Sequence, residues 1–432
     1  MERENVTATA ADDLTGVSFE ASAAVKRNRL VKLSSPLKVR IERDFHEVEE
    51  LREQWDEAVA EVGGSIYMSY DWSRTWWECY GADKELRLFL FSVNGRLVSV
   101  VPLYIDRIGF KPLQFAIARL VCANIPPKAF NPPVHADWAE PIFDTILRQM
   151  FEEDRCDLIS IGPVSEACGF LKCFESAAGE RGALCAKVSR ERAGVHTVFR
   201  LPKALDEFFD GMDKDERKKR KYEMRLLAKE ESIVKDVISS PEKVEAEFES
   251  FARLHADQWS GKGKLGHFGS WPRGKEYNLA LVRSLARLDR VRFVRILAGG
   301  EVISNQFAFV FGDTWYWELP SRVTDQKWNR FSLGTTGFFS LVEEAIKEGK
   351  SRIEGGIAHY GYKQKLGGTE QGMELLRVVG NRAGSKLRVR LYGWLRTCLQ
   401  LAYHKIWYAR VSPRLPKVFR KPIWTFWLRL DF

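Results

Sequence analysis

Two stretches of this chain share one pattern, and their repetition constrains the fold more than any other feature. Residues 86–105 read LRLFLFSVNGRLVSVVPLYI and residues 291–311 read VRFVRILAGGEVISNQFAFVF. Each is an apolar, β-rich run, then a two-residue turn (Asn94-Gly95 or Gly299-Gly300), then a second apolar run, which is the signature of a β-hairpin. The hairpins start 205 residues apart, a spacing that is about the size of one domain.

Helical segments that contain tryptophan precede both hairpins. In the first of them the apolar residues recur every three or four positions: Phe45, Val48, Leu51, Trp55, Ala58 and Val62. The four segments are 45–63 and 71–81 before the first hairpin, and 241–263 and 277–288 before the second. Two helices followed by a hairpin, twice, predict an α/β (α+β) fold that is built from a duplicated unit.

The length supports this division, because a single core rarely extends over 432 residues. We expect four parts: a disordered N-terminal tail over 1–36, a first unit over 37–200, a second unit over 201–382 and a basic tail over 383–432. The seven cysteines are scattered, with no C-x-x-C pair, and no run of 18 apolar residues occurs. These features favour a cytoplasmic protein with reduced thiols and no metal site.

The basic tail combines charge with aromatic residues. Residues 383–432 hold eleven Lys or Arg against one acid, and four tryptophans, among them Trp394 and Trp407. This mixture predicts an amphipathic helix at an anionic membrane surface, which would make the protein peripheral to the inner membrane. The alternative is a C-terminal helix whose aromatic side chains dock on the body of the protein.

A second charged run lies near the start of the second unit. Five consecutive cations, from Arg217 to Lys221, follow the acids Asp213, Asp215 and Glu216, an order that the helix dipole favours. The cations could bind phosphate or nucleic acid, or they could form one solvated face of a helix.

Two loops of the second unit are candidates for chemistry. Arg330, Ser332 and Gly334 come immediately before the helical segment 338–349, where backbone N–H groups and the helix dipole can bind an anion; an ordinary helix cap would look the same. The second loop, IEGGIAHYGYKQKLGG over 353–368, has two glycine pairs. They allow positive φ angles or the close approach of a bound molecule, and the lysines supply charge.

The order of these motifs resembles a known family. The chain has Leu254-His255-x-x-Gln258-Trp259, then the Gly-Gly hairpin, Ser332-x-Gly334, Ile353-Glu354-Gly355-Gly356, and Tyr360-x-Tyr362-Lys363-x-x-Leu366-Gly367-Gly368. This series resembles the C-terminal unit of the GNAT-related acyltransferases of the BioF2-like or CelD type. They are similar to the FemABX aminoacyltransferases of peptidoglycan synthesis, which have two tandem GNAT-like units. The resemblance covers roughly residues 40–380.

The resemblance implies an acyltransferase that moves an acyl group, such as acetyl, from acyl-CoA to an amine or hydroxyl of a cell-envelope or exopolysaccharide precursor. The pyrophosphate of the donor would lie on Arg330, Ser332, Gly334 and Thr335. Two other functions stay open. In one, the donor is an aminoacyl-tRNA held by the cations from Arg217 to Lys221. In the other, the chain is a non-catalytic scaffold of a polysaccharide synthesis complex.

The same resemblance suggests the catalytic and substrate-binding residues. Lys363 matches the lysine that borders the transfer site, where it could stabilise an oxyanion or act as a base. Glu354 and Glu318 are candidate general bases, although each could instead be the structural partner of a nearby cation. The remaining candidates are His359 as a catalytic residue and Tyr360, Tyr362, Trp317 and Arg217 as substrate contacts.

Overall fold

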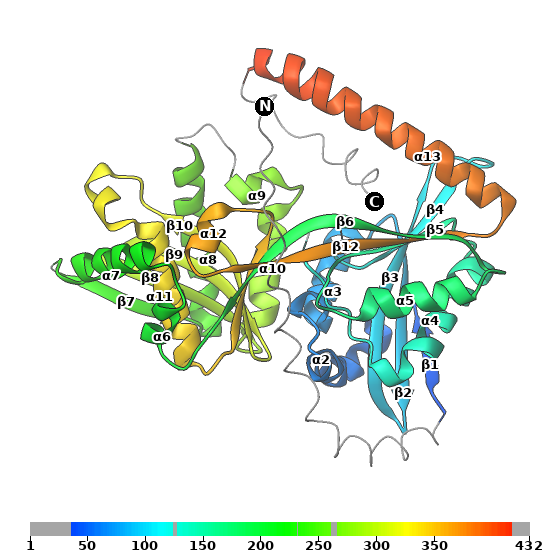
Figure 1. The fold of residues 1–432 in the computed structure, drawn as a ribbon, viewed down its shortest axis with the longest axis horizontal. Coiled ribbons are helices and arrows are strands. Elements are labelled where there is room, and N and C mark those ends of the chain that lie inside the picture. The colour runs from blue at the N-terminus through cyan, green and yellow to red at the C-terminus, as the bar shows by residue number, and fades with distance from the viewer. Residues whose placement is uncertain (1–35, 124–127, 231, 261–265, 417–432) are drawn as a thin grey trace, which may run out of the picture.

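One sheet runs through the whole molecule. The computed structural model describes residues 36–123, 128–230, 232–260 and 266–416, so all of the expected N-terminal tail except Pro36 lies outside the described residues. The sheet has twelve strands in the order β1-β2-β3-β4-β5-β12-β6-β11-β10-β9-β8-β7. Figure 1 shows two halves, with β6 and β12 crossing the centre between them.

The twelve strands are bounded as follows. They are β1 (Lys38–Glu42), β2 (Glu85–Val93), β3 (Arg96–Ile108), β4 (Phe115–Leu120), β5 (Leu158–Ser165), β6 (Cys185–Arg200), β7 (Ile233–Ile238), β8 (Val291–Ala298), β9 (Glu301–Phe311), β10 (Thr314–Arg322), β11 (Arg352–Ile357) and β12 (Thr369–Gly380).

The two halves have the same strand pattern. In the first half β1 to β4 are antiparallel neighbours, and β4 then pairs with β5 in parallel. In the second half β7 to β10 are antiparallel neighbours, and β10 pairs with β11 in parallel. The duplicated α/β unit is therefore confirmed. Each half is completed by a strand from the end of the other, because β12 pairs with β5 and β6 pairs with β11.

Both predicted hairpins are present. The turn residues Asn94 and Gly95 have φ angles of 52° and 80°, and Gly299 and Gly300 have φ angles of 57° and 85°. Positive φ at both central residues is the geometry that matches the twist of two-residue hairpins, which explains why glycine recurs in both turns.

The helices cover the sheet, and one core joins the halves. They are α2 (Arg52–Glu61), α3 (Tyr70–Tyr80), α4 (Ala139–Arg148), α5 (Phe170–Glu180), α6 (Leu205–Asp210), α7 (Lys214–Ala228), α8 (Pro241–Ser260), α9 (Gly266–Ser270), α10 (Gly274–Ala286), α11 (Leu333–Lys347), α12 (Gly361–Lys365) and α13 (Ala383–Leu401). Trp72 of α3 meets Phe309 of β9 edge to face at 5.1 Å between ring centroids. The largest buried cluster includes residues of both halves, and a smaller cluster around α11 belongs to the second half and β6.

The helix α13 starts against the first half. The Asp157 carboxylate, which is 1% exposed, accepts hydrogen bonds from Ser385 at 2.6 Å and from Arg388 at 2.7 Å. Tyr392 stacks on Phe115 with 4.3 Å between centroids. These contacts attach the first turns of α13 to β4 and β5, and Figure 1 shows the helix extending from there along the top of the view.

Candidate active site

The strands β10 and β11 lie side by side only at their starts. Thr314–Tyr316 pairs in parallel with Arg352–Glu354, and no pairing between these two strands continues beyond that point. On its other side β10 shifts register against β9 between Trp317 and Leu319, which leaves Glu318 in a β-bulge. Bulges re-aim side chains and are frequent next to active sites. The sheet therefore opens in the middle of the second half.

A cavity of about 560 Å³ lies beside this opening, at the start of α11. Its wall brings together five of the residues that the sequence suggested, namely Trp317, Ser332, Gly334, Thr335 and Tyr362. The rest of the wall is Gln258, Pro320, Arg322, Trp328, Asn329, Leu333 and Leu366. We call it the α11 cavity.

The start of α11 provides positive charge from the helix dipole and from Arg322. Ser332 adopts the left-handed conformation, with φ 48° and ψ 51°, and its side chain does not cap the helix. Instead its hydroxyl donates to the Glu223 carboxylate at 2.8 Å. Arg322 lies next to Gly334 and makes a hydrogen bond to the Val323 carbonyl at 3.3 Å, with no ion pair within the described ranges. Free N–H groups together with a guanidinium suit an anion.

Two predicted residues lie away from this cavity. The Arg330 side chain is 61% exposed, forms an ion pair with Glu230 at 2.8 Å and does not line the cavity wall. Arg217 is on α7, where it pairs with Asp210 at 3.0 Å. Each guanidinium is thus already partnered by a carboxylate.

A second cavity, of about 400 Å³, lies between the halves. Consecutive side chains of a strand point to opposite faces, and Tyr316 lines this cavity whereas its neighbour Trp317 lines the α11 cavity. The two cavities therefore approach β10 from opposite faces. We call the second one the interface cavity, because both halves and the exchanged strands contribute to its wall. The first half contributes Ser65, Asn131, Phe143 and Phe170, the second half Thr314, Tyr316, Arg352 and Glu354, and the exchanged strands His196 and Gln371.

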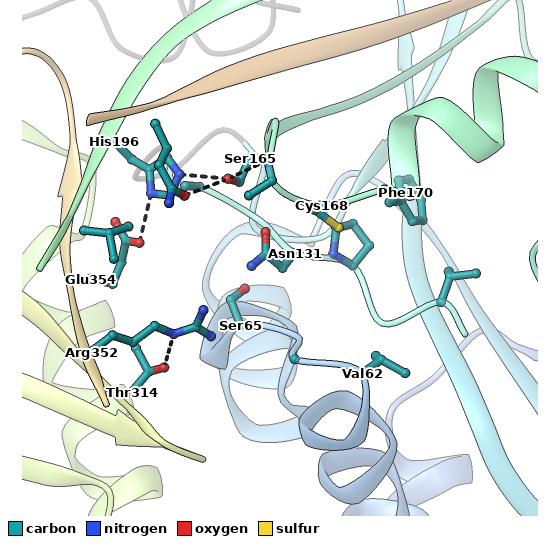
Figure 2. Close-up of a pocket in the computed structure, with 18 of the residues that line it drawn as sticks. Val62, Ser65, Asn131, Ser165, Cys168, Phe170, His196, Thr314, Arg352 and Glu354 are labelled. Atoms are coloured by element: carbon teal, nitrogen blue, oxygen red, sulfur yellow. Dashed lines mark hydrogen bonds and ion pairs between the residues drawn. The ribbon is translucent and has the colours of Figure 1, made fainter. Parts of the chain in front are cut away.

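His196 lies at the centre of a row of hydrogen bonds in the interface cavity (Figure 2). Its Nδ1 is 2.9 Å from Glu354 Oε2, and its Nε2 is 2.9 Å from Ser165 Oγ. The other oxygen of Glu354 accepts the Gly356 N–H at 3.1 Å. Nothing in the sequence had pointed to Ser165 or His196, since neither belongs to a recognisable motif.

Lys363 is buried where the strands part. It is 5% exposed, and its ammonium donates to the Gly355 carbonyl at 2.6 Å. The ring of Tyr360 lies 4.7 Å from the same Nζ. Burial lowers the pKa of Lys363 from 10.5 to about 8, against the opposing effect of the Glu354 carboxylate. Lys363 lines neither cavity, but the Gly355 carbonyl that it contacts lies one residue beyond the point where β10 and β11 cease to pair.

The two remaining catalytic candidates differ in their surroundings. Glu318 is 9% exposed and forms an ion pair with Lys128 of the first half. His359 is 67% exposed, with its Nδ1 2.7 Å from Glu370 Oε1, and it lines neither cavity. The structure thus brings Glu354 into a cavity and leaves His359 at the surface.

The glycine pairs of this loop are explained by β6. A Cβ atom at Gly355 would lie 2.7 Å from the ring of Phe199, and one at Gly368 would lie 2.5 Å from the Thr197 methyl group. Gly356 has a φ angle of 79°, which favours glycine. The close approach that we expected from a bound molecule comes, at Gly355 and Gly368, from the exchanged strand. Within the described residues no group of three or more metal-ligating side chains occurs.

Comparisons with known proteins agree with the resemblance. Residues 214–364 match the family model of the acetyltransferase (GNAT) domain named Acetyltransf_6. No curated protein sequence matches the chain. Among solved structures, FemX is 12% identical, with a TM-score of 0.55 over 75% of this chain and 95% of that one.

Two further structures are similar over much of the chain. A conserved protein of unknown function from Bacteroides thetaiotaomicron is 9% identical, with a TM-score of 0.49 over 79% of this chain and 100% of that one. A tandem GNAT protein from the clavulanic acid biosynthesis pathway is 12% identical, with a TM-score of 0.38 over 80% and 100%. At these identities the likeness concerns the fold, and of the three structures named here FemX has a TM-score above 0.5.

Proposed function

This chain is an acyltransferase, and its residues 214–364 match the GNAT acetyltransferase domain. We propose that it transfers an acyl group, represented by acetyl, from acyl-CoA to an amine or hydroxyl of a cell-envelope or exopolysaccharide precursor. The observation that carries the proposal is the opening between β10 and β11, which has one cavity on each face of β10. A donor and an acceptor that enter from opposite faces would meet at the opening. Holding two reactants in this way is a large part of transfer catalysis.

The α11 cavity is the proposed donor site. The pyrophosphate of CoA would accept hydrogen bonds from the first N–H groups of α11 and from the Arg322 guanidinium. The hydroxyl of Thr335 and the small Gly334 lie on the same wall. Trp317 and Tyr362 supply apolar surface for the pantetheine arm. The acyl group would then reach the place where the strands part.

An aminoacyl-tRNA donor has less support. Its phosphates would need the five cations of α7, but three of them are neutralised: Arg217 pairs with Asp210, Arg220 with Glu216 and Glu223, and Lys221 with Asp206. Lys218 and Lys219 alone in this run have no ion pair among the described residues. The similarity to FemX concerns the fold. The scaffold alternative is set aside, because the GNAT domain makes the chain an enzyme.

Lys363 is the proposed source of charge stabilisation at the transfer point. With a pKa of about 8, a substantial part of Lys363 is neutral at the upper end of the physiological pH range. Its ammonium form can stabilise the negative charge that develops on the carbonyl oxygen or on the departing thiolate. Glu318 is less suited to act as a base, because it already pairs with Lys128.

The acceptor is proposed to bind in the interface cavity. Hydroxyl, amide and guanidinium groups of Ser65, Asn131 and Arg352 share its wall with the rings of Phe143 and Phe170. Polar groups interspersed with aromatic rings suit a sugar, which has hydroxyl edges and apolar faces. The cavity is bounded by both halves, which gives the first half the role of an acceptor wall.

The helix α13 is proposed to hold the enzyme at an anionic membrane, at the cytoplasmic face of the inner membrane. In addition to the side chains that attach it to the body, α13 has exposed apolar residues, Leu387, Leu391, Trp394 and Leu395, and the exposed cations Lys386 and Arg390. Such a helix lies along a lipid surface. No helix in the described part of the chain is long and apolar enough to span a bilayer.

The donor assignment is tested by thermal shift with acetyl-CoA and free CoA, since a ligand that binds the folded state raises the melting temperature. We expect a shift that is lost in Arg322→Ala and retained in Arg330→Ala, the matched control whose guanidinium is paired with Glu230. No shift with either compound, together with salt-sensitive binding of tRNA that requires Lys218 and Lys219, would refute the CoA donor.

A further inference from the structure

Ser165, His196 and Glu354 lie in one row along the wall of the interface cavity. Ser165 ends β5, His196 is on β6 and Glu354 is on β11. Figure 2 shows dashed contacts from Ser165 to His196 and from His196 to Glu354. The distance from His196 Nε2 to the serine Oγ and the distance from its Nδ1 to the glutamate Oε2 are both 2.9 Å. Three separate strands thus bring a hydroxyl, an imidazole and a carboxylate into contact.

The row lies beside the opening between β10 and β11. The last pair of these two strands joins Tyr316 to Glu354. On its other side β11 pairs with β6, where Ile357 is opposite His196. His196 is therefore next to the segment of β11 that no longer pairs with β10, where the proposed donor and acceptor meet. A group at this place can act on the acceptor while it attacks the thioester directly.

The hydrogen bonds determine which ring nitrogen of His196 can accept a proton. One oxygen of the Glu354 carboxylate accepts the Gly356 N–H at 3.1 Å, and the other faces Nδ1. An ionised carboxylate only accepts hydrogen bonds, so a neutral imidazole donates to it from Nδ1. Nε2 is then left as an acceptor for the Ser165 hydroxyl.

The Ser165 hydroxyl can pass a proton from the cavity to His196. Two acceptors lie near its hydrogen, and His196 Nε2 at 2.9 Å is closer than Gln371 Oε1 at 3.4 Å. The Ser165 oxygen accepts the Ala167 N–H at 3.4 Å, and its second lone pair can accept from a hydroxyl that binds in the cavity. A proton taken up by the serine oxygen can therefore displace the serine's own proton onto the imidazole.

Two buried polar atoms of the same wall point to a ligand with hydroxyl groups. Ser65 is 4% exposed. Its Oγ and the Asn131 Oδ1 are both buried without a hydrogen bond in the described structure, and Figure 2 shows both side chains facing the space beside His196. An unmade hydrogen bond on a buried group costs roughly 1–3 kcal/mol. The hydroxyl groups of a bound acceptor would supply the missing partners.

The charges of the wall favour a hydroxyl over an amine as the attacking group. Apart from His196, the charged side chains that line the cavity are Arg352 and Glu354. The guanidinium would repel an ammonium group. The carboxylate already accepts hydrogen bonds from Gly356 and from the imidazole. A hydroxyl is neutral, and it needs a base that takes its proton as it attacks.

We propose that Ser165 and His196 form a proton relay that acts as the general base for a hydroxyl of the acceptor during direct transfer. As the acceptor oxygen attacks the carbonyl carbon of the thioester, its proton passes to Ser165 Oγ and the serine proton passes to His196 Nε2. The carbon–sulfur bond then breaks, and the acyl group is left as an ester on the acceptor. The thiolate takes a proton from water, and His196 returns its proton to water. Glu354 is a positioning residue that fixes the imidazole.

The tautomer of His196 tests the relay without any substrate. Bare and protonated ring nitrogens have different 15N chemical shifts, and the His196 signals of 15N-histidine-labelled protein are identified by their loss in His196→Gln. At pH 8, where an ordinary imidazole is neutral, we expect a proton on Nδ1 and a bare Nε2. A proton on Nε2, in the other tautomer or in the cation, would overturn the proposal, because Nε2 could not accept another.

Glu354→Gln should reverse this tautomer with little change in side-chain size. The Gly356 N–H holds the side-chain oxygen, so the amide NH2 of the glutamine faces Nδ1 and donates to it. His196 then carries its proton on Nε2. We expect the 15N spectrum to show this change in a protein that melts near the wild-type temperature. An unchanged tautomer in folded Glu354→Gln would refute the role of Glu354.

Transfer to glucosamine, which has hydroxyl groups and an amine, tests the base and the acceptor class together. Transfer is followed by the release of free CoA from acetyl-CoA, and hydroxylamine distinguishes the products because it cleaves esters and leaves amides intact. We expect an acetyl ester and a rate that falls about 100-fold or more in His196→Gln and Glu354→Gln. Ser165→Ala should also be slow. Its matched control is Ser160→Ala, a buried serine of β5 that lines neither cavity, which should keep the wild-type rate.

The donor and the acceptor site in this proposal rest on the proposed function, and the two can fail separately. A thermal shift with CoA together with a protonated Nε2 refutes the relay and leaves the donor standing. The expected tautomer without any CoA shift refutes the donor and supports the relay. Where the CoA shift is present, an amide product, or equal rates in wild type and His196→Gln, including no release by either, would overturn the relay.

Discussion

Replacing Lys363 by Met should make the protein more stable at neutral pH and remove its transfer activity. The reason is the burial of its ammonium, which lowers the pKa of Lys363 from 10.5 to about 8. A lowered lysine pKa means that the folded state disfavours the charged form. This penalty is complete below pH 8 and disappears as the pH rises through 10.5.

The magnitude follows from these two values. At pH 7 the penalty is about 3 kcal/mol, and at pH 10 it has fallen to about 1 kcal/mol. The substitution also leaves the Gly355 carbonyl without its donor, which costs about 1 kcal/mol at either pH. The stability of Lys363→Met relative to wild type should therefore be about 2.5 kcal/mol more favourable at pH 7 than at pH 10.

Urea denaturation of both proteins at pH 7 and pH 10 measures this difference. Lys365→Met is the matched control, because Lys365 is exposed on the same short helix, and its relative stability should not change between the two pH values. The reasoning is refuted if Lys363→Met gains no stability over wild type on going from pH 10 to pH 7, or if Lys365→Met shows the same gain.

Two further predictions concern the attachment and the exposed face of α13. Burial alone would raise the pKa of Asp157, but hydrogen bonds from Arg388 and Ser385 hold that pKa below its usual range. Asp157→Asn should therefore lower the free energy of unfolding by about 3 kcal/mol at pH 7. A carboxyl group with a depressed pKa stabilises the folded state only at pH values above that pKa. The free energies of unfolding of wild type and variant, measured with urea, should therefore converge as the pH falls toward 3. A difference between them that stays constant with pH would contradict the assignment. The double variant Leu391→Asp, Trp394→Asp should no longer sediment with vesicles of phosphatidylglycerol, to which the wild type binds, whereas unchanged sedimentation would show that this face of α13 does not contact lipid.

The parts of the fold that depend on local sequence could be predicted. The two hairpins follow from alternating runs around turns that require positive φ. The helix over 338–349 was also expected, but α11 begins at Leu333, so Gly334 and Thr335 lie in its first turn and not in a loop before it. The exchange of β6 and β12 could not be predicted, because the pairing of a strand with one edge or another leaves no mark on its own residues.

The same limit applies to the candidate sites. Sequence motifs led to Lys363, Ser332 and Glu354, which are close to the opening between β10 and β11. They did not lead to Ser165 or His196, because these residues lie on strands that meet only through the exchange. The solvent exposure of individual side chains could not be predicted either. His359 and Lys363 are four residues apart, yet His359 is mostly in solvent and Lys363 is buried.

The exchanged strands also affect how the chain can fold while it is being made. β6 is synthesised well before β11 and β12, the strands that flank it in the sheet. At usual rates of translation the roughly 170 residues between β6 and β12 take about 10–35 s to appear. During that time β5 and β6 each have an edge without its final neighbour, which is a template for pairing with other chains. A product that ends before β12 would keep those edges permanently, so we expect premature termination to yield aggregates in place of a working first half.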